Sequence, residues 1–466
     1  MSRTVVVLAA LLLVAVAGAG GGLFLALSRA EGPAIEIVRP TGLVGRSATF
    51  EATVEAPRAE LLALHAVIEQ EGAAHPLFSL DDPASADMRQ EGPDLVRIGR
   101  TFDRESHPEL RAGAATVRVS ATRPVVFGLS ERSTTVEVDV EVRLQPPRLA
   151  VASTFHYINH GGSELVVYTV SPPDAESGVR VGDREYPGYP AAGAVEGAGD
   201  NLRLAFFALD YDQDLDTPIE LYARDAAGNQ ASAQFDHRRF PRRFRRSRIT
   251  VSDGFLQRVV PSIVSQVPDL ADEQPDGTDE DWLDLYLFIN GELRRRNRAT
   301  LLDLAAGTAP QMQWSGAFRQ LANSQVESGF ADHRTYLYNG DEVDQQVHLG
   351  FDLASTANAP IVASNDGTVV HAGYFGIYGN CVIVDHGMGL QSLYAHLSSI
   401  AVSPDDEVDQ GQQLGLSGQT GLAGGDHLHF AMLLHGRPVS PIEWWDPHWI
   451  EDRILRKLRA AGAGGE

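Results

Sequence analysis

Three short motifs in the C-terminal third of the chain carry side chains that bind metals or transfer protons. In the first, H-L-G-F-D, His348 and Asp352 lie four positions apart. On one extended strand both side chains would share a face, and Gly350 between them would leave room for an ion. Taken alone, this pattern more often marks a core histidine beside a turn aspartate, so its interpretation depends on the other two motifs.

The second motif, D-H-L-H-F, places His427 and His429 two positions apart among apolar residues. A strand would turn both imidazoles to one face, where one can bind a metal while the other stays free to move protons. The glycine-rich residues 418–425 predict a flexible loop whose backbone approaches the site closely. In the third motif, Y-A-H-L, the same alternation predicts that Tyr394 and His396 share a face.

In this order, the three motifs resemble the lysostaphin-type, or LytM-type, zinc endopeptidases, which cut peptide bonds in bacterial peptidoglycan. The resemblance covers roughly residues 314–445 and includes D-H-R-T-Y at 332–336 and Y-G-N-C-V-I-V-D-H-G at 378–387. It implies a β-rich catalytic domain that holds one zinc ion. The implied zinc ligands are His348, Asp352 and His429, the implied catalytic pair is His396 and His427, and we expect substrate contacts from Tyr394, Asn380 and Arg334.

The chemistry of this ligand set agrees with the resemblance. Two imidazoles and one carboxylate leave a fourth position open for water, whose pKa zinc lowers toward about 7. No glutamate is placed as in H-E-x-x-H enzymes, so a histidine with a pKa near neutrality must take the proton. We expect His427 to be this base and His396 to stabilise the oxyanion or protonate the leaving amine, although the two roles could be exchanged.

The first residues predict export. Residues 4–28 carry no charged side chain, and roughly 20 apolar residues suffice to cross a bilayer. Arg3 precedes the run, so the positive-inside rule keeps the N-terminus in the cytoplasm. We expect a single-pass inner-membrane anchor with the bulk of the chain in the periplasm. A cleaved signal peptide is the alternative, because Ser28 and Ala30 are small residues suited to cleavage.

Composition excludes several classes of protein. A length of 466 residues predicts more than one domain. A formal net charge of -24 argues against nucleic acid as a partner. Cys381 is the only cysteine, which excludes intramolecular disulfides and thiolate clusters. Any metal must therefore be held by histidine and carboxylate.

The region between the anchor and the motifs is rich in short alternating runs, which predict two immunoglobulin-like β-sandwich modules. An acidic turn in the second module lacks the glycine and the glutamate of an EF-hand, which leaves either a solvated turn or another kind of calcium site. A basic block follows. We expect it to be an exposed linker or, alternatively, a site that binds anionic wall polymer or lipid headgroups. The turn contains Asp210, Asp212, Asp214 and Asp216, and the block contains Arg238, Arg239, Arg242, Arg243, Arg245, Arg246 and Arg248.

A helix is predicted between the basic block and the motifs. Thr278 and three acids open an apolar-periodic run that closes on arginines at 294–298, an arrangement that complements the helix dipole. The predicted fold is therefore mainly β, with a helical connector before a C-terminal LytM-type peptidase domain. The predicted parts are an anchor or signal segment at 1–30, β-sandwich modules at 31–146 and 147–236, a basic linker and helical segment at 237–311, the zinc endopeptidase domain at 312–446, and a C-terminal amphipathic helix and tail at 447–466.

The sequence thus predicts an exported, membrane-tethered zinc endopeptidase that hydrolyses peptide cross-links of peptidoglycan. Its partners would be peptidoglycan as the substrate and the membrane through the N-terminal helix. A cell-envelope protein is a further candidate partner. The alternative is a non-hydrolytic LytM-like protein that binds peptidoglycan or activates a wall amidase. Inactive relatives typically lose zinc ligands, whereas all five expected residues are present here, which favours the enzyme.

Overall fold

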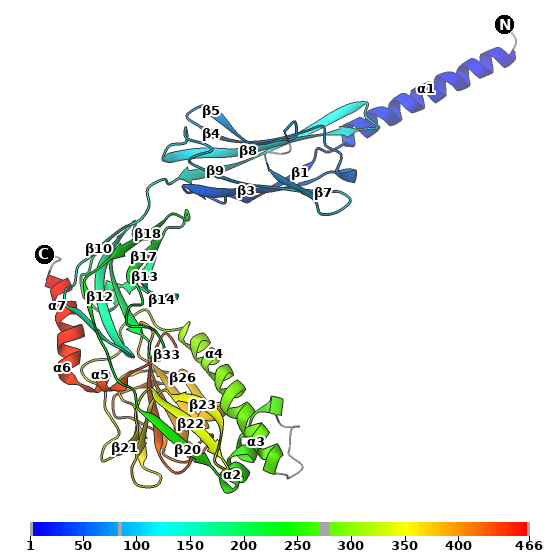
Figure 1. Ribbon diagram of the computed structural model, residues 1–466. Coiled ribbons are helices and arrows are strands. Elements are labelled where there is room, and N and C mark those ends of the chain that lie inside the picture. Colours follow the sequence, from blue (N-terminus) through cyan, green and yellow to red (C-terminus); the bar gives the residue numbers. More distant parts are fainter. Residues whose placement is uncertain (1–2, 83–85, 271–278, 464–466) are drawn as a thin grey trace. The chain divides into compact units, whose positions relative to one another are not determined.

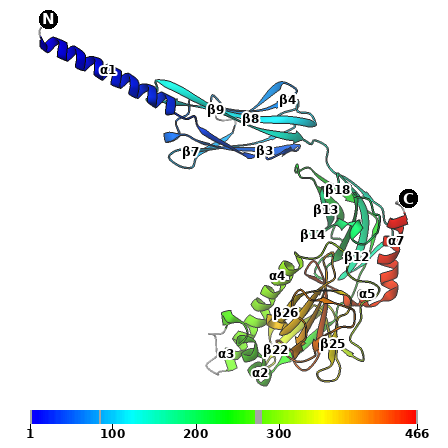
Figure 2. The same cartoon turned by 180° about the vertical axis from the view of Figure 1, so that it is seen from behind.

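The computed structural model describes residues 3–82, 86–270 and 279–463. The chain divides into two compact units, Met1–Pro147 with Arg224–Ala231, and Arg148–Ala223 with Ser232–Glu466. Figures 1 and 2 show the elements of both units from opposite sides. Strands predominate in each unit, which confirms the predicted mainly β fold.

The first unit combines the N-terminal helix with a two-layered β structure. Helix α1 (Arg3–Arg29) contains the predicted apolar segment, and Leu11–Arg29 is long and apolar enough to cross a membrane, with a mean hydropathy of 2.2. After it, two sheets pack through alternating buried side chains such as Phe50, Leu64 and Ile98. The sheets are β1-β3-β7-β6 (Ala34–Arg39, Ser47–Glu55, Leu95–Asp103, Asp87–Gln90) and β2-β9-β8-β4-β5 (Leu43–Val44, Ser130–Val142, Gly113–Val125, Ala63–Gln70, Ala73–Ser79). The immunoglobulin-like character of this sandwich stays a prediction.

The second unit opens with another pair of sheets, which we call the second sandwich. Their strands are β10-β12-β16-β15 (Arg148–Val151, Gly162–Ser171, Leu202–Leu209, Tyr189–Pro190) and β14-β13-β17-β18 (Arg184–Pro187, Glu176–Val181, Ile219–Arg224, Gln230–Gln234). In the acidic turn, Arg184 pairs with Asp210 and, at 2.9 Å, with Asp212. Because an arginine engages both carboxylates, the geometry favours a structural turn over a calcium site.

The C-terminal part of the second unit is built on a large sheet in which β24 (Phe351–Ala354), β32 (Leu428–Leu434) and β28 (Leu390–Leu397) are consecutive neighbours. Its other strands are β21 (Gln325–Ser328), β27 (Asn380–Asp385), β26 (Gly367–Tyr374), β30 (Glu407–Val408) and β33 (Arg437–Val439). Two smaller sheets accompany it, β20-β22-β23 (Arg246–Val251, Asp332–Tyr338, Asp341–His348) and β25-β31-β29 (Pro360–Val362, Gln413–Leu416, Ser399–Ile400). Antiparallel pairing places Asp352 opposite His429 and Ala395 opposite the same histidine. The sheet thereby brings the three sequence motifs side by side.

The predicted helical connector is present. Helices α2 (Asp253–Val264) and α3 (Asp279–Phe288) pack beside β22 through a core that includes Tyr286 and Tyr336, whereas α4 (Arg294–Ala305) places Leu301 in a separate cluster with Leu393 of β28. The π-helical segment η5 (Ile289–Leu293) joins α3 to α4, and Ser252 caps α2 by accepting a hydrogen bond from the Phe255 amide. Thr278, the predicted start of the helix, lies outside the described residues.

The basic block is largely exposed, as the sequence predicted, but two parts of it form strands and not a linker. Its first part forms β19 (His237–Phe240), which pairs in parallel with β11 (His156–Asn159), and its last part enters β20, which pairs with β22. Between the two strands, Arg242 donates to Ser440 Oγ at 2.8 Å. The linker prediction was wrong because the pairing partners of both strands lie far away in sequence. The charged residues of the block gave no local pattern that indicates a strand.

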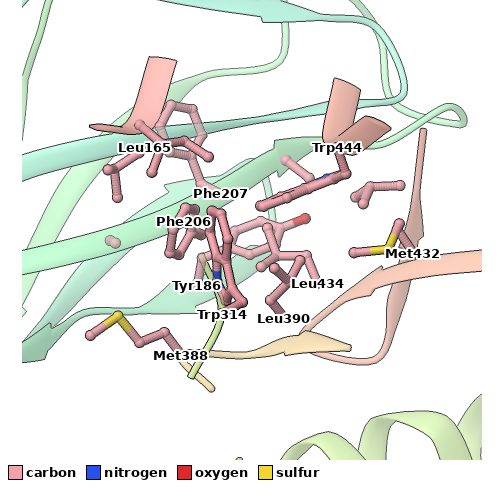
Figure 3. Close-up of a cluster of buried hydrophobic side chains, with 14 of the residues drawn as sticks. Leu165, Tyr186, Phe206, Phe207, Trp314, Met388, Leu390, Met432, Leu434 and Trp444 are labelled. Carbon is pink, nitrogen blue, oxygen red and sulfur yellow. The ribbon is translucent and has the colours of Figure 1, made fainter. Parts of the chain in front are cut away.

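One hydrophobic core joins the second sandwich to the large sheet that contains β24, β28 and β32 (Figure 3). Leu165 and Phe206 of the sandwich belong to the same cluster as Met432 of β32. Trp444 of α5 (Pro441–Trp445) fills the space between them, with ring centroids 5.9 Å from Phe206 and 5.6 Å from Trp314. The sequence predicted separate modules here, whereas the shared core packs them against each other.

The C-terminal helices add a buried ion pair to this junction. They are α6 (Pro447–Ile450), the π-helical η7 (Glu451–Leu455) and α7 (Arg456–Ala463). Lys457 of α7 donates to Glu164 Oε1 at 2.7 Å and to the Leu165 carbonyl at 2.8 Å, and both charged side chains are almost fully buried. The pair therefore ties the last helix to strand β12.

Lys457→Ala is expected to lower the free energy of unfolding of the second unit by about 3–5 kcal/mol, because it leaves the Glu164 carboxylate buried without its partner. Arg456→Ala is the matched control, since its exposed pair with Asp452 should cost less than about 1 kcal/mol. Urea denaturation followed by tryptophan fluorescence reports on this unit, because all five tryptophans lie between residues 282 and 449. Equal effects of the two substitutions would contradict the role assigned to the pair.

Candidate metal and catalytic centre

Three side chains from three strands converge on one point. His348 ends β23, Asp352 lies in β24 and His429 lies in β32. His348 Nε2 lies 2.9 Å from Asp352 Oδ1 and 2.9 Å from His429 Nδ1, and His429 Nδ1 lies 3.0 Å from Asp352 Oδ1. The structure therefore brings together the three residues that the family resemblance implied as ligands.

The sequence predicted that His348 and Asp352 share one strand, but the structure places them on two different strands. The chain leaves β23 at His348, bends at Leu349 and Gly350, and enters a different sheet as β24. A Cβ atom on Gly350 would lie 2.6 Å from the His429 ring and 2.7 Å from the Phe430 carbonyl oxygen. Position 350 therefore requires a glycine because the backbone passes close to His429 there. The sequence had predicted that this glycine leaves room for an ion on a strand face.

The protonation states suit metal binding. His348 Nδ1 lies 3.0 Å from the Gly329 carbonyl, which can only accept, so the proton sits on Nδ1 and the Nε2 lone pair faces the other ligands. Burial lowers the pKa of His429 to about 4, which keeps this imidazole neutral. Burial acts to raise the pKa of Asp352, but the neighbouring imidazoles, with His348 first among them, outweigh it and hold that pKa well below its usual value.

This donor set fits a divalent transition metal. Two imidazole nitrogens and one carboxylate oxygen make up the three protein ligands that are typical of catalytic zinc sites, which keep a fourth position open. The three ligand atoms lie within 4.8 Å of one another, so a single ion can contact all of them. We refer to His348, Asp352 and His429 as the metal group.

Arg334 of β22 holds the second oxygen of Asp352. Its guanidinium donates to Asp352 Oδ2 at 2.9 Å and to Ser328 Oγ at 2.8 Å, which leaves Asp352 Oδ1 for the metal group. The sequence predicted a substrate contact for Arg334, and the structure adds this positioning role. Ser328, which also lies 3.3 Å from His348 Nδ1, was missed, because only the pairing of β21 with β24 brings it opposite Asp352.

Two further histidines lie beside the metal group. His427 Nδ1 lies 2.9 Å from the Gly425 carbonyl, and His396 Nδ1 lies 2.8 Å from the Thr420 carbonyl. Because a carbonyl only accepts, each neutral ring carries its proton on Nδ1 and keeps a lone pair on Nε2. His427 Nε2 lies 3.4 Å from Asp352 Oδ1, and the two ring centroids are 4.9 Å apart. The glycine-rich loop thus fixes the tautomers of both rings.

The two rings differ in basicity. Burial lowers the pKa of His396 well below its usual value, and the nearby His427 and His429 lower it further. Burial also acts to lower the pKa of His427, but the hydrogen bond to Asp352 and the charge of that carboxylate outweigh it, so the pKa of His427 is raised. His427 is therefore the stronger base of the pair.

Tyr394 and His396 do not share a face, which corrects the prediction made from their alternation. The Tyr394 hydroxyl lies in the core, where it accepts hydrogen bonds from the Ser364 amide at 2.6 Å and from Ser392 Oγ at 2.9 Å. His396 has a φ of 63°, a left-handed conformation that breaks the alternation of β28. Its ring therefore turns to the metal group while Tyr394 points away, so the structure does not support a substrate contact from Tyr394.

Asn380 lies at the start of β27, where its Nδ2 donates to the Leu397 carbonyl at 3.0 Å. Its backbone amide donates to Thr420 Oγ1 at 2.9 Å. Asn380 therefore ties the end of β28 to the loop that carries the His396 acceptor. Its contact with substrate stays a prediction.

Comparison with known proteins supports the peptidase assignment. Residues 346–441 match the sequence pattern of peptidase family M23. Peptidoglycan DD-endopeptidase ShyA of Vibrio cholerae is 40% identical over 96 residues, which cover 21% of this chain and 22% of ShyA. The DD-carboxypeptidase/endopeptidase Mpg of Neisseria meningitidis is 38% identical over 97 residues, which cover 21% and 22% of the two chains. The chain thus spans about a fifth of the length of these curated relatives.

Solved structures align with different parts of the chain. The catalytic domain of lysostaphin from Staphylococcus simulans is 26% identical, with 28% of this chain and 98% of that domain aligned at a TM-score of 0.24. A zinc containing peptidase from Vibrio cholerae is 13% identical, with 88% and 85% of the two chains aligned at a TM-score of 0.26. The assignment rests on the sequence match and confirms the predicted lysostaphin-type domain: residues 346–441 of this chain belong to peptidase family M23.

Proposed function

We propose that this chain is a zinc-dependent endopeptidase that hydrolyses peptide cross-links of bacterial peptidoglycan. The observation that carries the proposal is the metal group, whose three ligand atoms converge with His427 and His396 beside them. Relatives that match this region are named peptidoglycan DD-endopeptidases. A metal group with an adjacent free base is what hydrolysis of an amide needs.

The metal group would hold zinc, which when bound supplies a Lewis acid and lowers the pKa of water. The other residues position the ligands and move the proton. Arg334 fixes the orientation of the Asp352 carboxylate. His427 donates Nδ1–H to the Gly425 carbonyl, so the neutral ring keeps a lone pair on Nε2, and this atom accepts a proton from the attacking water and returns it to the leaving amine.

His396 has a different part in this proposal from the one first expected. Its Nδ1–H is bound to the Thr420 carbonyl, and its low pKa keeps the ring neutral, so it has no donor left for an oxyanion. Its Nε2 is an acceptor. We assign to it the second hydrogen bond from the attacking water, which orients that water toward the scissile carbonyl.

Digestion of purified cross-linked peptidoglycan by the full chain in detergent tests this function. Dimeric muropeptides should disappear and monomers should accumulate, and a zinc chelator should stop the conversion. Binding to peptidoglycan without loss of dimers would instead favour the non-hydrolytic alternative.

Gly350→Ala is expected to weaken zinc binding by about 10–100-fold, because the new methyl group would displace the His429 ring from the metal group. Gly307→Ala is the matched control, since a Cβ atom there meets nothing within 4 Å. Competition with a chromogenic chelator measures both affinities. Unchanged zinc affinity in Gly350→Ala would show that the close approach at His429 does not shape the site.

We also propose that α1 anchors the chain in the inner membrane, with the rest of the chain in the periplasm. The apolar Leu11–Arg29 segment and the basic Arg3 before it support this orientation. A reporter that is active only in the cytoplasm, fused after Glu466, should give no signal. The same fusion without residues 1–30 should be active, and a strong signal from the full chain would refute the topology.

A further inference from the structure

A basic cavity adjoins the metal group. It has a volume of about 520 Å³ and is lined by residues of β20, α2, α3, α4, β22 and the loop before His427, several of which are labelled in Figure 1. Three arginines line it, namely Arg258, Arg294 and Arg334, and no carboxylate is found among the described residues of its wall. In a chain with a formal charge of -24, this concentration of positive charge points to an anionic ligand.

Two of these guanidiniums are not neutralised by the described residues. Among the residues that the structure describes, Arg294 donates to Asn290, with Nε 3.0 Å from the backbone carbonyl and an Nη atom 2.6 Å from Oδ1. Burial lowers the pKa of Arg294, and its nearest ionisable neighbours include tyrosines and another arginine. In the described part of the chain, Arg258 donates to two backbone carbonyls, at 3.4 Å to Ala423 and 3.2 Å to Gly424. A half-buried arginine that has only neutral acceptors keeps its charge available for a ligand.

The cavity lies one side chain away from the reacting atoms. Arg334 lines the cavity and also donates to Asp352 of the metal group. Gly424 lines it from the other side, and the next residue, Gly425, provides the carbonyl that fixes His427. A peptide bound at the metal group would therefore place a neighbouring residue of the same peptide in this cavity.

We propose that the cavity binds a free carboxylate of the cross-linked stem peptide next to the scissile bond, with Arg294 as its principal partner. This inference rests on the proposed function and names the part of the substrate that the site recognises. Stem peptides carry free carboxylates, and a guanidinium binds a carboxylate through two parallel hydrogen bonds. Tyr286 and Tyr336, which share the wall, provide hydroxyl groups, while Arg334 is held by Asp352 and Ser328 and contributes charge.

The test combines a change in the enzyme with a change in the substrate. The full chain and its Arg294→Gln variant are each assayed on a purified muropeptide dimer and on the same dimer with its carboxylates converted to amides. Wild type should cleave the amidated dimer with a KM about 10–100-fold higher, the range expected for a lost charge-assisted hydrogen bond. Arg294→Gln should show that same higher KM on both substrates, with kcat and bound zinc unchanged.

Two further variants separate charge recognition from folding. Arg294→Lys keeps the charge and should recover part of the discrimination between the two dimers. Arg295→Gln is the matched control on the same helix, because Arg295 is exposed and pairs with Glu292. If Arg294→Gln fails to fold, the Arg294→Lys variant and the comparison of the two dimers on wild type still test the proposal.

The outcomes distinguish the two proposals. If wild type cleaves neither dimer, the proposed function fails. If wild type cleaves both dimers with the same KM, the function stands and carboxylate recognition by the cavity is overturned. If wild type prefers the free carboxylate but Arg294→Gln keeps that preference, Arg294 is not the partner.

Discussion

His348→Ala is expected to abolish zinc binding and hydrolysis together. The substitution removes one of three protein ligands, and the two that remain, Asp352 and His429, are too few for a stable catalytic site. It also removes the imidazole that lies 2.9 Å from each of them. Zinc per chain, measured by elemental mass spectrometry after dialysis, should fall from about one to below about 0.1. Conversion of muropeptide dimers should fall to background.

His448→Ala is the matched control for this prediction. Its side chain is 83% exposed and pairs with Asp452 on the C-terminal helices, so zinc content and rate should stay at the wild-type level. A His348→Ala protein that keeps one zinc per chain would show that the metal lies elsewhere.

His427→Ala is expected to keep zinc but lose rate. The metal group stays complete in this variant, because its three ligand atoms meet without His427. Loss of a general base costs about 10²–10⁴-fold in kcat. Zinc content and kcat should be measured on the same sample, so that a fall in rate is not mistaken for a loss of metal.

The neighbouring histidine provides the comparison. His429→Ala should lose zinc, because His429 Nδ1 lies 3.0 Å from Asp352 Oδ1 and close to His348 Nε2. If His427→Ala lacks zinc while His429→Ala remains loaded, the roles within H-L-H are reversed. Full activity of zinc-loaded His427→Ala would remove this residue from the mechanism.

The identity of the site residues could be predicted because each motif is short and chemically distinctive. His429 lies in β32 and His427 comes just before it, in an isolated bridge to Gly418, so local alternation still brings the two histidines to one side. Their meeting with His348 was expected from family resemblance, whereas the structure attributes it to the pairing of β24 and β32. Local pattern therefore predicted the residues, and long-range strand pairing explains their geometry.

Two predictions failed because one backbone angle or one distant partner decided the outcome. Strict alternation placed Tyr394 beside His396, but the left-handed φ of His396 reverses the expected face. The arginines of β20 were interpreted as a linker because the strand that pairs with β20, β22, lies far away in sequence. Neither feature has a local sequence signal. The core shared between the second sandwich and the large sheet with β24, β28 and β32 also has no local sequence signal.

Cleavage of a purified cross-linked muropeptide dimer in water enriched in heavy oxygen tests the central claim most directly. We predict that the zinc-loaded full chain splits the dimer into two monomers, with one heavy oxygen in the carboxyl group newly formed at the cross-link. Mass spectrometry of the products locates that oxygen, and a chelator should prevent its incorporation. An unchanged dimer, or a peptide released from its sugar with the cross-link intact, would contradict the assignment of this chain as a cross-link endopeptidase.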